Sequence, residues 1–340
     1  MSEPDFSQSK MPQFKSSRRL VLDHPELHHY TDAEGLKGIW NSRTIWATHF
    51  SHLSDKSEIH VLRKPMETLL KNKFNKLIQE QMSKDLTFRR EIENYRSSVF
   101  YAEQTAKNFI SAHYDVSFLQ SGLAMAEPFI TSFCSHSNDN AYERDNGLLS
   151  QWRGYSGKGK YALVFDTSRL CRLLESEWHS YHWVKIEIGE VFYYFDQNTI
   201  LDKFPDLIDV SLSEMTSVLN GGGLSDEVFK TFSSAATLLK HRGFEEEREI
   251  RIVAIPLKRR DFKKQIAIKD MTGYPPLKKV HYGENNRRYL ALFESFQEPL
   301  PITRIIVGPS QNQEGDEAFV HDLTKGSVKI TLSETPYIGP

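Results

Sequence analysis

Cysteine is scarce in this chain: there are only two, Cys134 and Cys171, and they do not have CxxC spacing. This excludes a disulfide scaffold and a cysteine-ligated zinc site. The sequence contains no run of about 18 apolar residues, and its first twenty residues lack the apolar segment of a secretion signal. We therefore expect a cytoplasmic protein without membrane contact; the sequence makes no prediction of its oligomeric state.

An excess of charge of either sign is also missing. Lys plus Arg number 43 and Asp plus Glu 45, so the formal net charge is −2. The chain therefore has no overall positive field of the kind that drives nonspecific nucleic-acid binding. One local basic run, Lys258–Lys264, offers a surface to a protein or nucleic-acid acceptor, and the simpler alternative is a solvated loop.

The glycine pattern of a dinucleotide-binding fold is absent as well. Gly154, Gly157 and Gly159 precede the apolar strand predicted at 161–166. In the dinucleotide fingerprint, the glycines instead link a strand to the helix that follows it. A Rossmann fold is therefore excluded.

The remaining pattern predicts an α+β protein. A flexible tail at 1–20 precedes a single domain at 21–340, because a chain with 39% hydrophobic residues can bury one large core. Apolar periodicity predicts a helical insertion at about 58–113 and further helices at 201–219, 226–240 and 286–296. Alternating or β-branched runs predict strands at 27–31, 43–48, 129–134, 161–166, 184–195, 250–255, 280–282 and 303–307.

Three of these strands carry polar side chains where apolar ones are usual. His29 and Tyr30 end the first strand, and Thr31 and Glu34 follow at the spacing of a capping box. A polar strand end that runs into a helix N-terminus suits the hydroxyl or phosphate groups of a ligand. The simpler alternative is a strand with one buried, hydrogen-bonded histidine.

The other polar strands carry Ser132 and the set Glu247, Glu249 and Arg251. Alternation along the strand places Glu247, Glu249 and Arg251 on one face. Two carboxylates on one face repel each other unless a cation or a ligand hydroxyl lies between them. The alternative is an edge strand whose charges face water.

Several blocks of the sequence resemble the bacterial domain-of-unknown-function 2971 family. They are His29-Tyr30-Thr31 with Gly35-Leu36-x-Gly38-Ile39, Asp55-x-x-Glu58, Thr131-Ser132-Phe133-Cys134, Trp152-x-x-Tyr155 with Gly159 and Phe165-Asp166, Phe244-x-x-Glu247-x-Glu249-x-Arg251, and Val307-Gly308-Pro309.

The layout of these blocks is similar to the ADP-ribosyltransferase fold, in the branch with a histidine on the first strand and a glutamate on a late one. That resemblance implies a split, mostly antiparallel central sheet with a helical insertion, NAD as co-substrate, and no metal. It implies that His29 and Thr31 hold an NAD ribose and that Ser132 braces the pocket. Tyr30 and Tyr155 would stack on the ligand's aromatic rings.

The same resemblance implies that Glu249 or Glu247 is the key carboxylate and that His29 assists it. A fixed carboxylate stabilises the positive charge that develops on ribose as nicotinamide leaves. Arg251 would neutralise the carboxylates or bind the pyrophosphate. The expected activity is ADP-ribosyl transfer to a macromolecule, or NAD hydrolysis, in a bacterial toxin or defence enzyme.

Three other functions remain open at this stage. A metal-dependent hydrolase would draw on the histidines and carboxylates between His28 and Glu58. A nucleophilic hydrolase would pair Cys134 with a histidine such as His136. A non-catalytic NAD- or nucleotide-binding module would keep the fold without turnover.

Overall fold

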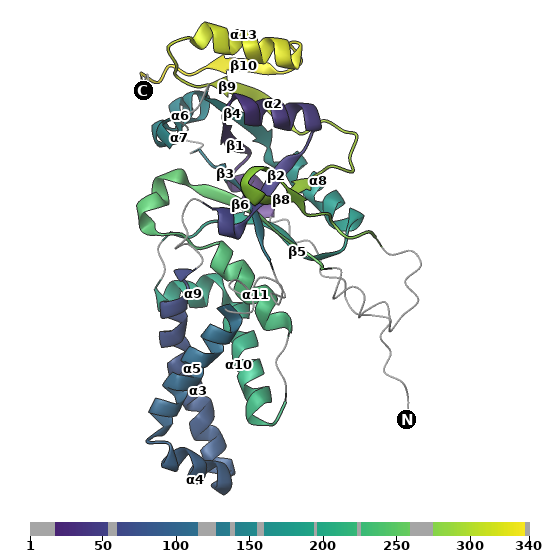
Figure 1. The fold of residues 1–340 in the computed structure, drawn as a ribbon. Coiled ribbons are helices and arrows are strands. Elements are labelled where there is room, and N and C mark those ends of the chain that lie inside the picture. Colours follow the sequence, from purple (N-terminus) through teal and green to yellow (C-terminus); the bar gives the residue numbers. More distant parts are fainter. Residues whose placement is uncertain are drawn as a thin grey trace.

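The computed structural model describes residues 18–53, 60–114, 127–136, 140–154, 160–193, 196–222, 226–258 and 275–336. The chain forms an open sheet with helices around it and a lobe of helices that extends away from the sheet (Figure 1). This confirms the predicted mixed α+β class. Most of the predicted tail and most of the basic run Lys258–Lys264 lie outside the described residues, and helix α1 (Arg18–Asp23) includes the end of that tail.

The sheet is almost entirely antiparallel, as predicted. Its main path runs β10-β9-β4-β1-β3-β2-β8-β7, and β6 joins it by pairing with both β3 and β5. Of the strand pairs described, β9 with β10 is the parallel one. The strands are β1 (Glu26–Thr31), β2 (Ile45–His49), β3 (Phe129–Cys134), β4 (Tyr161–Asp166), β5 (Trp183–Glu190), β6 (Glu249–Pro256), β7 (His281–Tyr282), β8 (Arg288–Leu292), β9 (Ile302–Val307) and β10 (Lys329–Leu332).

Helices form two groups. Those near the sheet are α1, α2 (Ala33–Ser42), α6 (Ala141–Asn146), α7 (Leu149–Gly154), α8 (Thr167–Ser180) and α13 (Gln313–Thr324). Those of the separate lobe are α3 (Arg63–Lys84), α4 (Leu86–Asn94), α5 (Ser98–Tyr114), α9 (Gln197–Lys203), α10 (Pro205–Leu219) and α11 (Asp226–Thr237). The predicted insertion supplies only half of the lobe, because α9 to α11 come from a later part of the chain.

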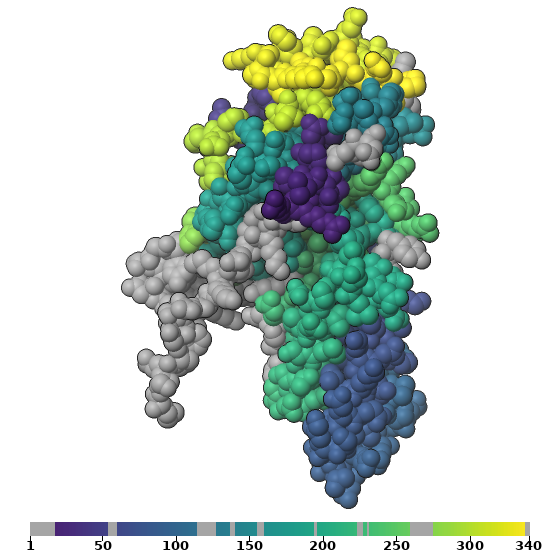
Figure 2. Space-filling model, turned by 180° about the vertical axis from the view of Figure 1, so that it is seen from behind, coloured from purple at the N-terminus to yellow at the C-terminus, as the bar shows by residue number. Residues whose placement is uncertain are grey.

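The lobe has a hydrophobic core of its own. Leu70, Phe74, Ile110 and Phe232 are among its fully buried side chains, and they come from both chain segments. The space-filling view shows the lobe as an extension below the sheet (Figure 2). Within the ranges that the structure describes, no helix combines the length and the apolar character needed to cross a membrane.

Helix α2 starts differently from the prediction. Its N-cap is Asp32, whose carboxylate accepts a hydrogen bond from the Gly35 amide at 2.8 Å. Thr31 is instead the last residue of β1, and its Oγ1 would lie 2.0 Å from a Cβ added at Gly35. The predicted capping box of Thr31 and Glu34 is therefore wrong, and a side chain at position 35 would collide with the end of β1.

Two further predictions are corrected by the strand positions. The helix predicted at 286–296 is absent, and β8 occupies 288–292 between β2 and β7. Glu247 ends the 3-10 helix Arg242–Glu247, and Arg248 turns the chain in a left-handed conformation with φ 42°. Strand β6 then begins at Glu249, so Glu247 does not share a strand with Glu249 and Arg251.

Candidate functional site

Strand β3 is the point at which the sheet forks. One of its edges pairs with β6 over its full length. The other edge pairs with β1 at Cys134 and with β2 at Ile130 and Phe129, so β1 and β2 leave the same edge in different directions. We call the region between β1 and β2 beside Thr131 and Ser132 the fork. Of the residues predicted for the site, His29 contacts Ser132 at the fork, and Glu249 and Arg251 lie on the neighbouring strand β6.

His29 fills part of the fork from β1. Its Nδ1 lies 2.9 Å from the Ser132 carbonyl oxygen. Because a carbonyl only accepts hydrogen bonds, Nδ1 carries the proton and Nε2 has the lone pair. Burial lowers the pKa of His29, so the ring is neutral at pH 7. The predicted histidine therefore presents a hydrogen-bond acceptor.

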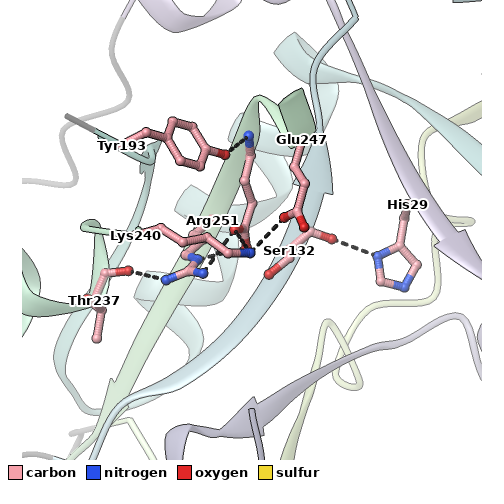
Figure 3. A network of polar contacts seen from close by, with 8 residues as sticks. His29, Ser132, Tyr193, Thr237, Lys240, Glu247 and Arg251 are labelled. Atoms are coloured by element: carbon pink, nitrogen blue, oxygen red, sulfur yellow. Dashed lines mark hydrogen bonds and ion pairs between the residues drawn. The ribbon is translucent and has the colours of Figure 1, made fainter. Parts of the chain in front are cut away.

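On β6, Glu249 and Arg251 form a buried ion pair. Arg251 donates from Nε to Oε1 at 2.7 Å and from Nη2 to Oε2 at 2.9 Å, which is the bidentate arrangement (Figure 3). Arg251 also donates from Nη1 to the Thr237 carbonyl at 2.8 Å. The two residues are only 4% and 2% exposed, so each charge depends on the other.

Lys240 joins the second predicted glutamate to this pair. Its ammonium lies 2.6 Å from Glu247 Oε2 and 3.1 Å from Glu249 Oε2. The Glu249 amide donates to the Tyr193 hydroxyl at 2.7 Å, which fixes the start of β6. The carboxylates are thus brought together by a shared cation, although they do not lie on one strand face. We call Lys240, Glu247, Glu249 and Arg251 the charged network.

The network keeps Glu249 ionised. Burial raises the pKa of this carboxyl, but Arg251 first, then Lys240 and a hydrogen bond from the Ser132 side chain, outweigh it and leave the pKa below its usual value. Ser132 pairs with Arg251 across the β3–β6 ladder, and so its hydroxyl lies on the same face of the sheet.

His29 approaches from the other face. Its ring lies 5.5 Å from that of Phe133, which belongs to the main core of the sheet. Since side chains alternate along β3, Phe133 and Ser132 point to opposite faces. Figure 3 accordingly shows His29 reaching the Ser132 carbonyl from the side away from the charged network. A ligand would therefore have to enter the fork to contact both His29 and the charged network.

Tyr30 lies inside the protein. It is 3% exposed, and its ring packs edge-on against Trp152 at 4.8 Å. Its hydroxyl accepts from the Leu148 amide at 2.8 Å and lies 3.1 Å from Nε2 of His136. Neither face of the ring is open to a ligand in this arrangement. Tyr155, the other predicted stacking residue, lies outside the described residues.

The alternative chemistries gain no geometric support. Among the residues that the structure describes, no three His, Cys, Asp or Glu side chains gather to hold a metal ion. Asp55 and Glu58 of the predicted cluster lie outside the described residues. Burial raises the pKa of the Cys134 thiol well above its usual value, which disfavours the thiolate that a nucleophile requires.

Sequence reasoning missed Lys240 and the two residues that contact the charged network from outside, Thr237 and Tyr193. They come from the end of α11 and the segment after β5, and their contacts depend on how the chain folds back onto β6. The acidic run around Glu247 predicted that a basic side chain lies close to the carboxylates, but it did not identify Lys240 as that side chain.

Comparison with known proteins adds one finding. Residues 151–252 match the family described as Protein of unknown function (DUF2971). The resemblance predicted from the sequence is confirmed over this segment, whereas no curated protein and no solved structure matches the chain. The DUF2971 segment contains the whole charged network, and His29 and Ser132 lie before it.

Proposed function

We propose that this chain is an NAD-dependent ADP-ribosyltransferase whose substrate occupies the fork. The observation that supports this most is the charged network, whose carboxylate Glu249 lies beside the Ser132 side chain on β3, the strand at which the sheet divides, while His29 contacts the Ser132 carbonyl from the opposite face. A fixed carboxylate near the ribose stabilises the positive charge that develops there as nicotinamide leaves.

The two glutamates have different roles in this proposal. The Glu247 side chain is 23% exposed and that of Glu249 is 4% exposed. Glu247 is therefore the carboxylate that contacts the ribose, and Glu249 is a positioning residue that holds Lys240 and, through it, Glu247. Arg251 serves as the internal counter-ion of Glu249, because its guanidinium is already engaged by Glu249 and Thr237.

The reaction breaks the bond between the ribose C1′ and the nicotinamide nitrogen. Nicotinamide leaves with the bonding electrons as a neutral molecule, and the ribose becomes oxocarbenium-like. Glu247 stabilises that charge, and Nε2 of neutral His29 accepts a hydrogen bond from a ribose hydroxyl. A nucleophile on the acceptor then forms the new bond at C1′ and releases its proton to water.

The proposal is tested by measuring the release of nicotinamide from NAD. Chromatography quantifies the release in reactions that contain cell lysate as the source of acceptor. We expect Glu247→Gln to reduce the rate about a hundredfold or more while NAD still binds. Glu245→Gln is the matched control, since Glu245 lies on the same 3-10 helix with its side chain 64% exposed. His29→Ala should weaken NAD binding.

Glu249→Gln separates positioning from catalysis. This change leaves Arg251 buried with an incomplete partner, so we expect a loss of stability of about 3–5 kcal/mol as well as of activity. Catalysis that persists in Glu247→Gln but vanishes in a folded Glu249→Gln protein would reverse the two roles. If NAD binds but is not cleaved by the wild type, the chain is a binding module, and if NAD does not bind, the proposal fails.

A further inference from the structure

Three aromatic rings stack across the strands at one end of the sheet. The indole of Trp46 on β2 lies 3.9 Å from the Tyr289 ring on β8, with 21° between the planes. Tyr289 in turn lies 5.3 Å from the His281 ring on β7, at 20°. We call Trp46, Tyr289 and His281 the aromatic stack. It lies outside the charged network and has no role in the proposed transfer reaction.

Trp46 is the open end of the stack. It is 50% exposed, although its strand neighbours Ile45 and Ala47 are fully buried in the core. Tyr289 covers one face of the indole. The remaining exposure leaves the outer face of the indole available to a ligand.

The stack is held rigidly from behind. Nε2 of His281 lies 3.3 Å from a carboxylate oxygen of Glu294, and Tyr289 is a paired residue of β8, opposite Thr48 on one side and His281 on the other. A rigid ring loses little conformational entropy when a partner stacks on it. The outer face of Trp46 is thus a preorganised platform.

A cation stands beside the platform. Arg287 is exposed, and its Nη2 donates to Thr48 Oγ1 at 3.3 Å. Thr48 pairs with Tyr289 and lies two residues from Trp46 on the same strand face. The guanidinium is therefore next to the stack. Planar ring and cation together match a nucleobase and its phosphate.

We propose that the outer face of Trp46 stacks on a base of single-stranded nucleic acid and that Arg287 holds an adjacent phosphate. Stacking on an exposed aromatic residue of a sheet requires an unpaired base, because a duplex hides the faces of its bases. The proposal is independent of NAD chemistry, since it uses neither the fork nor the charged network.

Fluorescence anisotropy with a labelled 12-nucleotide RNA, and with DNA of the same sequence, tests this surface. We expect binding that weakens as salt rises, and that falls about tenfold or more in Trp46→Ala. Arg287→Ala should weaken binding and flatten its salt dependence. Tyr282→Ala is the matched control: Tyr282 is 67% exposed and adjoins His281, but alternation points it to the other face.

Trp46→Phe guards against a folding defect, because it keeps a ring at the position and should retain part of the affinity. Equal affinity of wild type and Trp46→Ala for the oligonucleotide would overturn the proposal. The proposal would also be overturned if Tyr282→Ala lost as much affinity as Trp46→Ala, or if the protein preferred the duplex of the same sequence. Failure to bind either the RNA or the DNA at low salt would overturn it too.

Discussion

Several charged or titratable side chains of this protein are buried in its interior. Glu249 and Arg251 lie on a strand whose every residue is buried, and they are tolerated there because each oxygen and each guanidinium nitrogen described has a partner. His136 is buried as well, two residues after the end of β3, and its Nε2 lies 3.1 Å from the Tyr30 hydroxyl. Such residues link the stability of the fold to pH.

His136 should make the protein less stable as pH falls. Burial first, then Arg248 and Arg304, lower the pKa of His136 from 6.5 to about 3. Between these values the unfolded chain takes up a proton that the folded chain refuses, so the free energy of unfolding decreases as pH is lowered from 6.5 toward 3. At pH 5.5 this one histidine should cost roughly 1 kcal/mol relative to pH 8.

Urea unfolding at pH 8 and pH 5.5 measures that effect in the wild type and in His136→Gln. Gln retains a group able to hydrogen-bond Tyr30 but does not titrate, so the variant should show a smaller drop. Identical pH dependence of the two proteins would show that His136 is not responsible. His28, whose ring lies 3.9 Å from that of His136, also has a lowered pKa because of burial, and should account for part of the remaining slope.

At the scale of elements, the junction of β1 and α2 allows a specific test. An added methyl at Gly35 would lie 2.0 Å from Thr31 Oγ1. Gly35→Ala should therefore destabilise the protein by about 1–3 kcal/mol despite the better helix propensity of alanine. Removing the obstacle in Thr31→Ala/Gly35→Ala should recover much of the loss.

A double-mutant cycle from thermal or urea unfolding gives the coupling between these two positions. Additive effects would mean that Thr31 does not face Gly35. The cycle also bears on NAD binding, because a Thr31 side chain packed against α2 is a poor ribose ligand.

Several elements could be predicted from the sequence because their patterns are local. Strands at 129–134 and 161–166 match β3 and β4. Both are short runs rich in aromatic and β-branched or aliphatic residues, which suit a buried strand and little else. The helices of 58–113 were recognisable for a similar reason, since their apolar residues recur every three or four positions.

The sequence-based prediction was wrong where tertiary contacts determine the secondary structure. Arg288–Leu292 has leucine and alanine, which favour helix, yet pairing with β2 and β7 makes it a strand. In the candidate site, Ser132 and Glu249 were identifiable as polar residues on strands. The Lys240 contact was not, because it depends on the turn at Arg248 and on α11 lying over β6.

At the scale of the whole molecule, the sheet and the helical lobe have separate cores and should respond separately to damage. Phe232 is fully buried in the lobe, and Phe165 is fully buried in the sheet. Phe232→Ala should cost about 3–5 kcal/mol and speed hydrogen exchange mainly in α3, α5 and α10.

Phe165→Ala is the matched control and should speed exchange mainly in β1, β4 and β9. Hydrogen-exchange mass spectrometry of both variants makes the comparison. Uniform acceleration across the molecule in Phe232→Ala would show that lobe and sheet unfold as a single cooperative unit.

The lobe's origin in two chain segments also sets an order of events on the ribosome. Helix α5 ends at Tyr114 and α11 ends at Thr237, so about 120 residues of synthesis separate them, or roughly 6–24 s at about 5–20 residues per second. Through that interval α3 to α5 expose the apolar face that α10 and α11 later cover. We therefore expect chaperones that bind exposed apolar helices to associate with the nascent chain, and we expect slower translation between the two segments to lower the yield of soluble protein.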